Sequence, residues 1–225
     1  ARTDHVALLE RAVEHTRETV HSYRCVFTKQ ERISGRLRPT QKIEAAVIEE
    51  DPYAVCLKWV ENAPIGDQVL YVEGRYNDQM LVRPKGFLNA LVGTQRRDPT
   101  SPQVMANTLN PVTGFGLRRT LESLLEVYRL AEDRGEGTSR FVGYVTVNGR
   151  KAFKLERVLP EREDYPTKTT TWYLDAERLI PLGLEGTDWN DQLRCAYFFH
   201  DVEMNVGLTE EDFTPEACGF SPVKK

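Results

Sequence analysis

The sequence predicts an α+β domain built from a curved antiparallel sheet of about ten or eleven strands, with two helices packed on its concave face. Hydrophobic residues recur at helical spacing over residues 4–22 and 117–133. Much of the remaining chain alternates apolar and polar residues between turn signals, which is typical of antiparallel strands. Helices and strands do not alternate one by one, so a parallel sheet is excluded. Two helices cannot form a bundle alone, so their apolar stripes need the face of a sheet.

The first helix is predicted over residues 4–22. Asp4 suits its N-cap position, where a carboxylate accepts a backbone N–H. Leu9 and Val13 lie on an apolar stripe, and charged residues occupy the opposite side. This amphipathic pattern predicts a helix that lies across a sheet.

A first strand meander is predicted over residues 23–83. Alternation changes from a period of 3.6 to a period of 2 at Tyr23. Turn signals at Ser34-Gly35, Asp51-Pro52 and Gly74 separate the strands. The predicted strands cover residues 23–28, 37–50, 53–60, 68–73 and 78–82.

Residues 84–116 interrupt the strand rhythm. A connection of this length inside a compact domain is usually functional or mobile. We expect a short helix around Phe87–Val92 within it. A second long helix, the plug helix, is predicted over 117–133 because apolar residues such as Leu121 and Leu125 recur at helical spacing.

A second strand meander is predicted over residues 139–202. Asn148-Gly149 is the strongest short hairpin signal in the sequence, and it joins two of these strands. The predicted strands cover residues 141–147, 152–159, 168–174, 182–188 and 193–201. A C-terminal segment follows over 203–225, and we expect the whole chain, 1–225, to form a single domain.

Composition excludes several classes of protein. The chain has 225 residues and a formal net charge of -4 at pH 7, which gives no electrostatic basis for binding nucleic acid. No apolar run is long enough for a transmembrane helix. The opening Ala1-Arg2-Thr3 is consistent with a mature N-terminus from which a signal peptide has been removed. The four cysteines, Cys25, Cys56, Cys195 and Cys218, are either buried thiols or two disulfides of unassigned pairing.

No residue pattern indicates catalysis or metal binding. The four histidines lack the spacing of a zinc site, and no serine lies in a Gly-x-Ser-x-Gly motif. Gly114-Phe115-Gly116 lacks the third glycine of a phosphate-binding loop, and the turn before a helix explains it better. The acidic residues around Glu161 and Asp188 fit solvated loops. We therefore predict no enzymatic activity, no metal and no cofactor.

Two features remain as candidates for function. Aromatic residues recur in the predicted strands, where they either line a ligand cavity or fill an ordinary core between sheet and helices. The apolar segment around Phe87–Val92 lies next to Arg96 and Arg97. If exposed, this segment is a lid or a membrane-touching element, and if buried it is part of the core.

Several phrases of the sequence together resemble an uncharacterised bacterial family with a domain of unknown function. They are YRCVFTKQERISGRL, PYAVCLKWV and GDQVLYVEG, then NPVTGFGLRRTLESLL, YLDAERLIPLGLEG and YFFHDVEMNVGLTEEDF. That family is similar to the superfamily of periplasmic lipoprotein carriers, LolA and LolB. The resemblance implies an unclosed antiparallel β-barrel with helices packed into its mouth and an apolar cavity that holds acyl chains. A carrier activity is implied by the fold alone.

These expectations together give two hypotheses for function. The first is a non-enzymatic protein of the periplasm or cell envelope, a monomer, that binds an acyl chain or a lipidated partner between sheet and helices. The alternative is a protein-interaction module with a solid core, which binds through the outer sheet face or an edge strand. The predicted ligand-binding residues are Tyr23, Phe27, Trp59, Tyr71, Leu121, Leu125, Trp172 and Phe199. The predicted gate consists of Phe87, Leu88 and Leu91.

Overall fold

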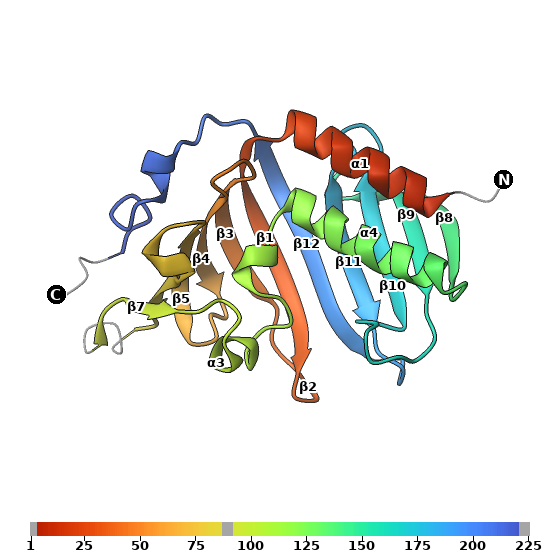
Figure 1. Ribbon diagram of the computed structural model, residues 1–225, viewed down its shortest axis with the longest axis horizontal. Helices are drawn as coiled ribbons and strands as arrows, with labels where there is room; N and C mark the ends of the chain where they lie inside the picture. The colour runs from red at the N-terminus through yellow and green to blue at the C-terminus, as the bar shows by residue number, and fades with distance from the viewer. Residues whose placement is uncertain (1–3, 87–91, 221–225) are drawn as a thin grey trace. The chain divides into compact units, whose positions relative to one another are not determined.

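The computed structural model describes residues 4–86 and 92–220 (Figure 1). The helices are α1 (His5–Thr19), α3 (Pro102–Met105) and α4 (Leu117–Asp133), with short 3₁₀ helices η1 (Tyr76–Asp78), η2 (Val112–Gly114) and η3 (Glu210–Phe213). The first strands are β1 (Ser22–Ile33), β2 (Arg36–Leu37), β3 (Gln41–Ile48), β4 (Ala54–Glu61), β5 (Gly66–Val72), β6 (Met80–Pro84) and β7 (Gln95–Arg97). The later strands are β8 (Thr138–Val147), β9 (Arg150–Val158), β10 (Thr169–Asp175), β11 (Pro181–Thr187) and β12 (Leu193–Met204).

The chain divides into two compact units. Unit 1 contains residues 1–19, 29–38 and 116–200, and unit 2 contains residues 20–28, 39–115 and 201–225. Strands β1 and β12 are each divided between the two units, with one part in unit 1 and the other in unit 2.

The twelve strands pair in the order β7-β6-β5-β4-β3-β1-β12-β11-β10-β9-β8, and β2 pairs with β1. Neighbours such as β3 and β4, or β9 and β10, run antiparallel. The order ends at β7 and β8, so within the described residues the sheet does not close on itself. The predicted fold class, an unclosed antiparallel sheet with two long helices, is therefore confirmed, with twelve strands in place of about ten or eleven.

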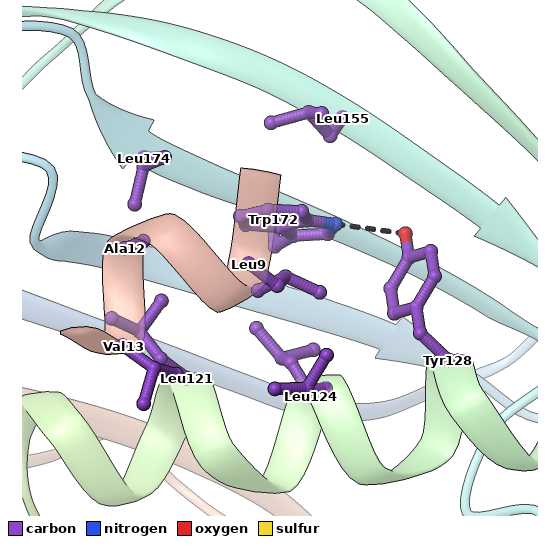
Figure 2. Packing of buried hydrophobic residues seen from close by; sticks show 10 residues of the cluster. Leu9, Ala12, Val13, Leu121, Leu124, Tyr128, Leu155, Trp172 and Leu174 are labelled. Atoms are coloured by element: carbon purple, nitrogen blue, oxygen red, sulfur yellow. Dashed lines mark hydrogen bonds between the residues drawn. The ribbon is translucent and has the colours of Figure 1, made fainter. Parts of the chain in front are cut away.

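Helices α1 and α4 of unit 1 lie side by side over one face of the strands β9 to β11 (Figure 1). Their apolar stripes form one buried cluster with strand residues, which Figure 2 shows from close by. Its members are Leu9, Ala12, Val13, Leu121, Leu124, Leu125, Tyr128, Leu155, Trp172 and Leu174. Within the described ranges, none of the helices has the length and apolar character needed to cross a membrane.

Trp172 is the largest side chain of this cluster, and solvent does not reach it. Its indole Nε1–H donates to the Tyr128 hydroxyl at 2.9 Å, so a β10 side chain and an α4 side chain are joined inside the core (Figure 2). His5 Nδ1 of α1 lies 3.1 Å from the same hydroxyl. A buried polar group without a partner is costly, so this network fixes both helices on the strands.

Unit 2 has its own core, in which the C-terminal segment covers strands β3 to β6. Phe213 and Phe220 are buried against apolar residues of these strands, including Ala54 and Leu70. The hydroxyl of Tyr53 lies 2.8 Å from the carbonyl oxygen of Phe115 and also holds the segment that precedes α4. Phe213 and Phe220 thus dock the C-terminal segment on these strands.

The predicted helix over 117–133 and the hairpin at Asn148-Gly149 are found where expected. The first helix is shorter than predicted, because Ser22 already begins β1. The strand predicted over 37–50 is interrupted after β2, where Pro39 lacks the N–H that a ladder needs.

The predicted loop 84–116 contains more structure than expected. Residues Gln95–Arg97 form the edge strand β7, which pairs with β6, and Pro102–Met105 form the short helix α3. Three residues are too few for an alternation to be visible in the sequence. The short helix expected around Phe87–Val92 lies almost entirely outside the described residues.

We predict that Tyr128→Phe lowers the free energy of unfolding by about 1–3 kcal/mol, because it leaves the buried indole N–H of Trp172 without an acceptor. Urea unfolding followed by circular dichroism measures the change. Tyr144→Phe is the matched control, since Tyr144 is 57% exposed, and we expect a change within about 0.5 kcal/mol. An equal effect of both substitutions would show that the buried network does not stabilise the core.

Candidate functional site

The eight predicted ligand-binding residues are divided evenly between the two units. Leu121, Leu125, Trp172 and Phe199 belong to unit 1. Tyr23, Phe27, Trp59 and Tyr71 belong to unit 2. The three predicted gate residues, Phe87, Leu88 and Leu91, lie outside the described residues. That these residues bind a ligand stays a prediction.

In unit 1, three of the predicted residues come together and one does not. Leu121, Leu125 and Trp172 belong to the buried cluster under α1 and α4. Phe199 is buried on β12, where its backbone carbonyl accepts a hydrogen bond from the side-chain amide of Asn148. Apolar side chains of α1 and α4 thus cover the face of the strands around Trp172, as Figure 2 shows.

The predicted residues of unit 2 are engaged with other side chains. The Tyr23 hydroxyl donates to Glu49 at 3.3 Å. Phe27 packs edge-on against Phe115. Trp59 is half-buried, and its indole N–H donates to a Gln41 oxygen at 2.7 Å. Tyr71 is buried with its ring centroid 6.1 Å from that of Tyr53.

Arg157 of β9 is a buried cation inside unit 1. Only 2% of it is exposed, and its guanidinium lies over the Tyr128 ring, 4.6 Å from the ring centroid. Nη2 donates to the Thr170 hydroxyl at 3.1 Å, and Thr170 also lies within hydrogen-bond distance of Thr167. Nε and Nη1 are buried and have no hydrogen-bond partner among the described residues. Buried arginines are rare unless they are paired.

The pKa values of Arg157 and of its neighbour His5 are both lowered, as expected for a buried cation without an anionic partner. Burial lowers the pKa of Arg157 to about 10, against the opposing influence of Tyr128 and Tyr165, so the guanidinium is still charged at neutral pH. Burial also lowers the pKa of His5, while Asp4 opposes and Arg157 adds to this decrease. Among the described residues of unit 1, the buried guanidinium of Arg157 has no anionic partner, and a buried charge of this kind is suited to binding an anion.

Sequence reasoning missed Arg157, although a signal was present. Glu156 and Arg157 are adjacent charged residues and suggest a solvated part of the strand. Strand alternation places Arg157 on the same face as Leu155 and Leu159, which are both buried. Glu156 points the other way and pairs with Arg140 at 2.6 Å.

An exposed group of aromatic rings lies on β8 and β9, and we name it the β8 aromatic patch: Phe141, Tyr144 and Phe153. Their ring centroids are 5.3 to 6.1 Å apart, and Phe141 and Tyr144 are 38% and 57% exposed. Lys151 Nζ lies 4.4 Å from the centroid of the Tyr144 ring. Phe153 also packs against the buried cluster, so the patch continues from the core to the surface.

A bulge in β8 brings the rings of the patch together. Register between β8 and β9 shifts between Phe141 and Gly143, so Val142 has no partner of its own. The extra residue lets Phe141 and Tyr144 face the same side although they are three positions apart. Gly143 has a φ of 142°, which a residue with a side chain rarely adopts.

The two ends of the strand order differ in character. β7 has only three residues, two of which are the arginines Arg96 and Arg97. Short, charged edge strands discourage pairing with another chain. β8 has ten residues and carries the exposed Phe141, Val142 and Tyr144. Among the described residues β8 is therefore the edge suited to binding a further strand.

No group of three or more histidine, cysteine, aspartate or glutamate side chains in the described parts of the chain could hold a metal ion. The groups of unit 1 that could contact a partner are therefore the rings of the β8 aromatic patch, the backbone groups on the unpaired side of β8 and the guanidinium of Arg157.

Several solved structures share the fold of this chain. A chain of the Pseudomonas aeruginosa MucA/MucB complex matches with a TM-score of 0.54 and 16% identity, over 94% of this chain and 61% of that chain. An uncharacterized conserved protein from Thermus thermophilus matches with a TM-score of 0.52 and 9% identity, over 91% of both chains. The present chain thus spans less than two thirds of the length of the Pseudomonas chain.

The sequence also matches a family model. Residues 20–220 match the family described as "Protein of unknown function (DUF1571)". This confirms the predicted resemblance to a family of unknown function. A LolA superfamily protein from Nitrosomonas europaea is among the similar structures, with a TM-score of 0.35 and 10% identity over 92% of this chain and 98% of that chain. That likeness is too slight to indicate a shared function. No curated protein matches the sequence.

We predict that Arg157→Met leaves the free energy of unfolding unchanged or raises it by about 1–2 kcal/mol, because an apolar side chain of similar length replaces an unpaired buried charge. Chemical denaturation measures the effect. Arg140→Met removes an exposed ion pair and is the control, with an expected loss below about 1 kcal/mol. A loss above about 3 kcal/mol for Arg157→Met would mean that the guanidinium holds the fold together.

Proposed function

The chain belongs to the DUF1571 family, and we propose that it is a non-enzymatic binding protein of the cell envelope that holds an extended segment of a partner protein on β8. The observation that carries this proposal is the β8 aromatic patch on an unpaired edge strand. We propose that the protein acts as a monomer in the periplasm, as the resemblance to periplasmic carriers implies.

Edge strands bind peptides by a simple mechanism. One side of β8 pairs with β9, and the other side pairs with no described strand, so its outward N–H and C=O groups are available to a further strand. Main-chain hydrogen bonds then give affinity, and pockets for alternate side chains give specificity. Phe141 and Tyr144 supply an apolar contact next to that edge, and Lys151 adds a positive charge.

The filled core of unit 1 supports a surface site over an interior one. Leu9, Leu121 and Trp172 are completely buried against one another, so the described side chains occupy the space between helices and strands. The MucA/MucB complex adds support of another kind, because a chain of that complex has this fold and the complex joins two proteins.

We predict that a photoreactive amino acid at position 144 captures one discrete partner protein in intact cells, because Tyr144 sits in the binding surface. The same amino acid at position 65 is the matched control, since Ile65 is 58% exposed on unit 2. The captured protein is then purified and titrated, and Phe141→Ser is expected to weaken binding at least about tenfold, as for the loss of a buried aromatic anchor.

Equal capture at positions 144 and 65 would contradict the proposal. So would an unchanged affinity of the Phe141→Ser variant for the partner. Ile65→Ser is the titration control, and circular dichroism shows whether each variant is folded.

A second candidate function is the binding of an acyl chain or of a lipidated partner between helices and strands. The unpaired guanidinium of Arg157 favours it, because a fatty-acid carboxylate would satisfy the free Nε and Nη1 donors. Each buried CH₂ contributes about 0.8 kcal/mol, so an acyl chain can be held without other polar contacts. Such a ligand must displace side chains such as Leu121 and Leu125, which requires α4 to move from the strands.

One titration separates the two candidates. With a fluorescent fatty acid as the probe, binding through β8 predicts no saturable signal, because the core of unit 1 is filled. Saturable binding that is lost in Arg157→Met and kept in Phe141→Ser would favour the carrier instead. A fluorescent fatty alcohol of the same length is the control for contacts made by the carboxylate.

A further inference from the structure

Two cysteines that are distant in the sequence meet in unit 2. Cys56 is the third residue of β4, and Cys218 lies in the C-terminal segment after η3. Both side chains belong to the same apolar cluster, in which Cys218 is buried and Cys56 is half-buried, and both line the same cavity. The Cys218 thiol donates to the carbonyl oxygen of Asp212 at 3.5 Å, which helps to hold it in this position.

The C-terminal segment is held on the strands around these thiols. Phe213 and Phe220 are buried in the core of unit 2 on either side of Cys218. An Arg83 N–H donates to the carbonyl oxygen of Gly219 at 3.1 Å, and the N–H of Cys218 donates to the carbonyl of Thr214 at 3.0 Å. The position of Cys218 in the core of unit 2 is therefore fixed by packing and hydrogen bonds on both sides.

The surroundings of Cys56 favour its thiolate. The neighbouring Cys218 thiol lowers the pKa of the Cys56 thiol, burial opposes this decrease, and the positive charges of Arg24, Lys58 and Arg83 lower the pKa further. The neighbouring Cys56 raises the pKa of Cys218, and burial adds to that increase. Cys56 is also the less buried of the two thiols, so both its environment and its exposure make it the better nucleophile.

A cavity in unit 2 gives access to the half-buried Cys56. Cys56 and Cys218 line a cavity of about 690 Å³, together with the three cations and the acidic residues Glu44, Asp201 and Glu203. Gln68 also lines the cavity, and its side-chain oxygen is buried without a hydrogen-bond partner among the described residues. A small thiol-reactive molecule can therefore approach Cys56.

The other two cysteines provide a contrast within the same chain. Burial, with a contribution from Glu49, raises the pKa of Cys25, although Cys25 lines the same cavity. Burial raises the pKa of Cys195 in unit 1 to about 12. Both are buried, and a thiol with a raised pKa is mostly protonated at neutral pH, so both are poor nucleophiles in the folded protein.

We propose that Cys56 and Cys218 form a dithiol–disulfide site, which a disulfide-bearing oxidant closes into a covalent link between β4 and the C-terminal segment. This inference does not depend on the proposed function. An oxidising compartment such as the cell envelope is where such a link persists.

The chemistry is a thiol–disulfide exchange in two steps. The Cys56 thiolate attacks one sulfur of the oxidant, the S–S bond of the oxidant breaks, and one thiolate leaves with a mixed disulfide on Cys56. Cys218 then loses its proton and attacks the Cys56 sulfur, which releases the second half of the oxidant as a thiolate. Two protein thiols are oxidised, and one disulfide is reduced to two thiols that take up the two protons.

The test uses glutathione disulfide as the oxidant and the full chain, first fully reduced. Intact mass spectrometry is expected to show the loss of two hydrogen atoms, and a non-reducing peptide map is expected to join the Cys56 and Cys218 peptides. Cys218→Ser is expected to stop at a single glutathione adduct on Cys56. Cys56→Ser is expected to react at least about tenfold more slowly, because the remaining thiol is mostly protonated.

Cys25→Ser is the matched control, since it removes a thiol from the same cavity and should leave the cross-link unchanged. A cross-link that includes Cys25 or Cys195 would overturn the proposal. So would separate glutathione adducts on Cys56 and Cys218 without a cross-link.

Thermal unfolding gives a second measurement that does not depend on the folding of a variant. The cross-link closes a long loop of the unfolded chain, so oxidation is expected to raise Tm by about 5–15 °C and dithiothreitol to reverse the rise. The same treatment of Cys25→Ser should give the same shift. An oxidised protein with an unchanged Tm would overturn the proposed link between β4 and the C-terminal segment.

Discussion

The burial of Trp172 is the interaction on which unit 1 depends. Its ring can be removed from water only because α1 and α4 lie over β10, and its N–H can be buried only because Tyr128 accepts it. The helices depend equally on this contact, since isolated helices of their length are marginal in water. The face of the strands and the apolar stripes of the two helices are therefore stable only when they pack together. The hydrogen bonds among Trp172, Tyr128 and His5 then select one arrangement of helices and strands.

Local patterns in the sequence were enough to predict most of the fold. The helix Leu117–Asp133 was predicted at its observed ends, because leucines at helical spacing and flanking glycines both mark it. Asn148-Gly149 identified the β8–β9 hairpin, since these residues adopt the positive φ angles that its turn requires. Leu121, Leu125 and Trp172 lie together in one buried cluster, and their role as ligand-binding residues stays a prediction.

Features that depend on distant parts of the chain could not be predicted. β7 has three residues, and only its pairing with β6 makes it a strand. Arg157 follows the buried face of β9, but no sequence rule says that a charged residue on that face lacks a partner. Cys56 and Cys218 meet because Phe213 and Phe220 dock the C-terminal segment, and spacing alone leaves four cysteines with three possible pairings.

Two features of the structure are unfavourable for stability or solubility, and each suits a different kind of partner. Both lie in unit 1: the buried guanidinium of Arg157, which has two donors without a partner, and the ten-residue edge strand β8, which carries exposed aromatic rings. Both cost stability or solubility, while β7 shows that the same chain also contains a short, charged edge of the protective kind. In a chain whose helices and strands otherwise agree with their local sequence, such exceptions are where function is expected. Because side chains already fill the space under α1 and α4, the β8 edge can accept a partner without any rearrangement of the core, whereas a ligand of Arg157 cannot bind without one.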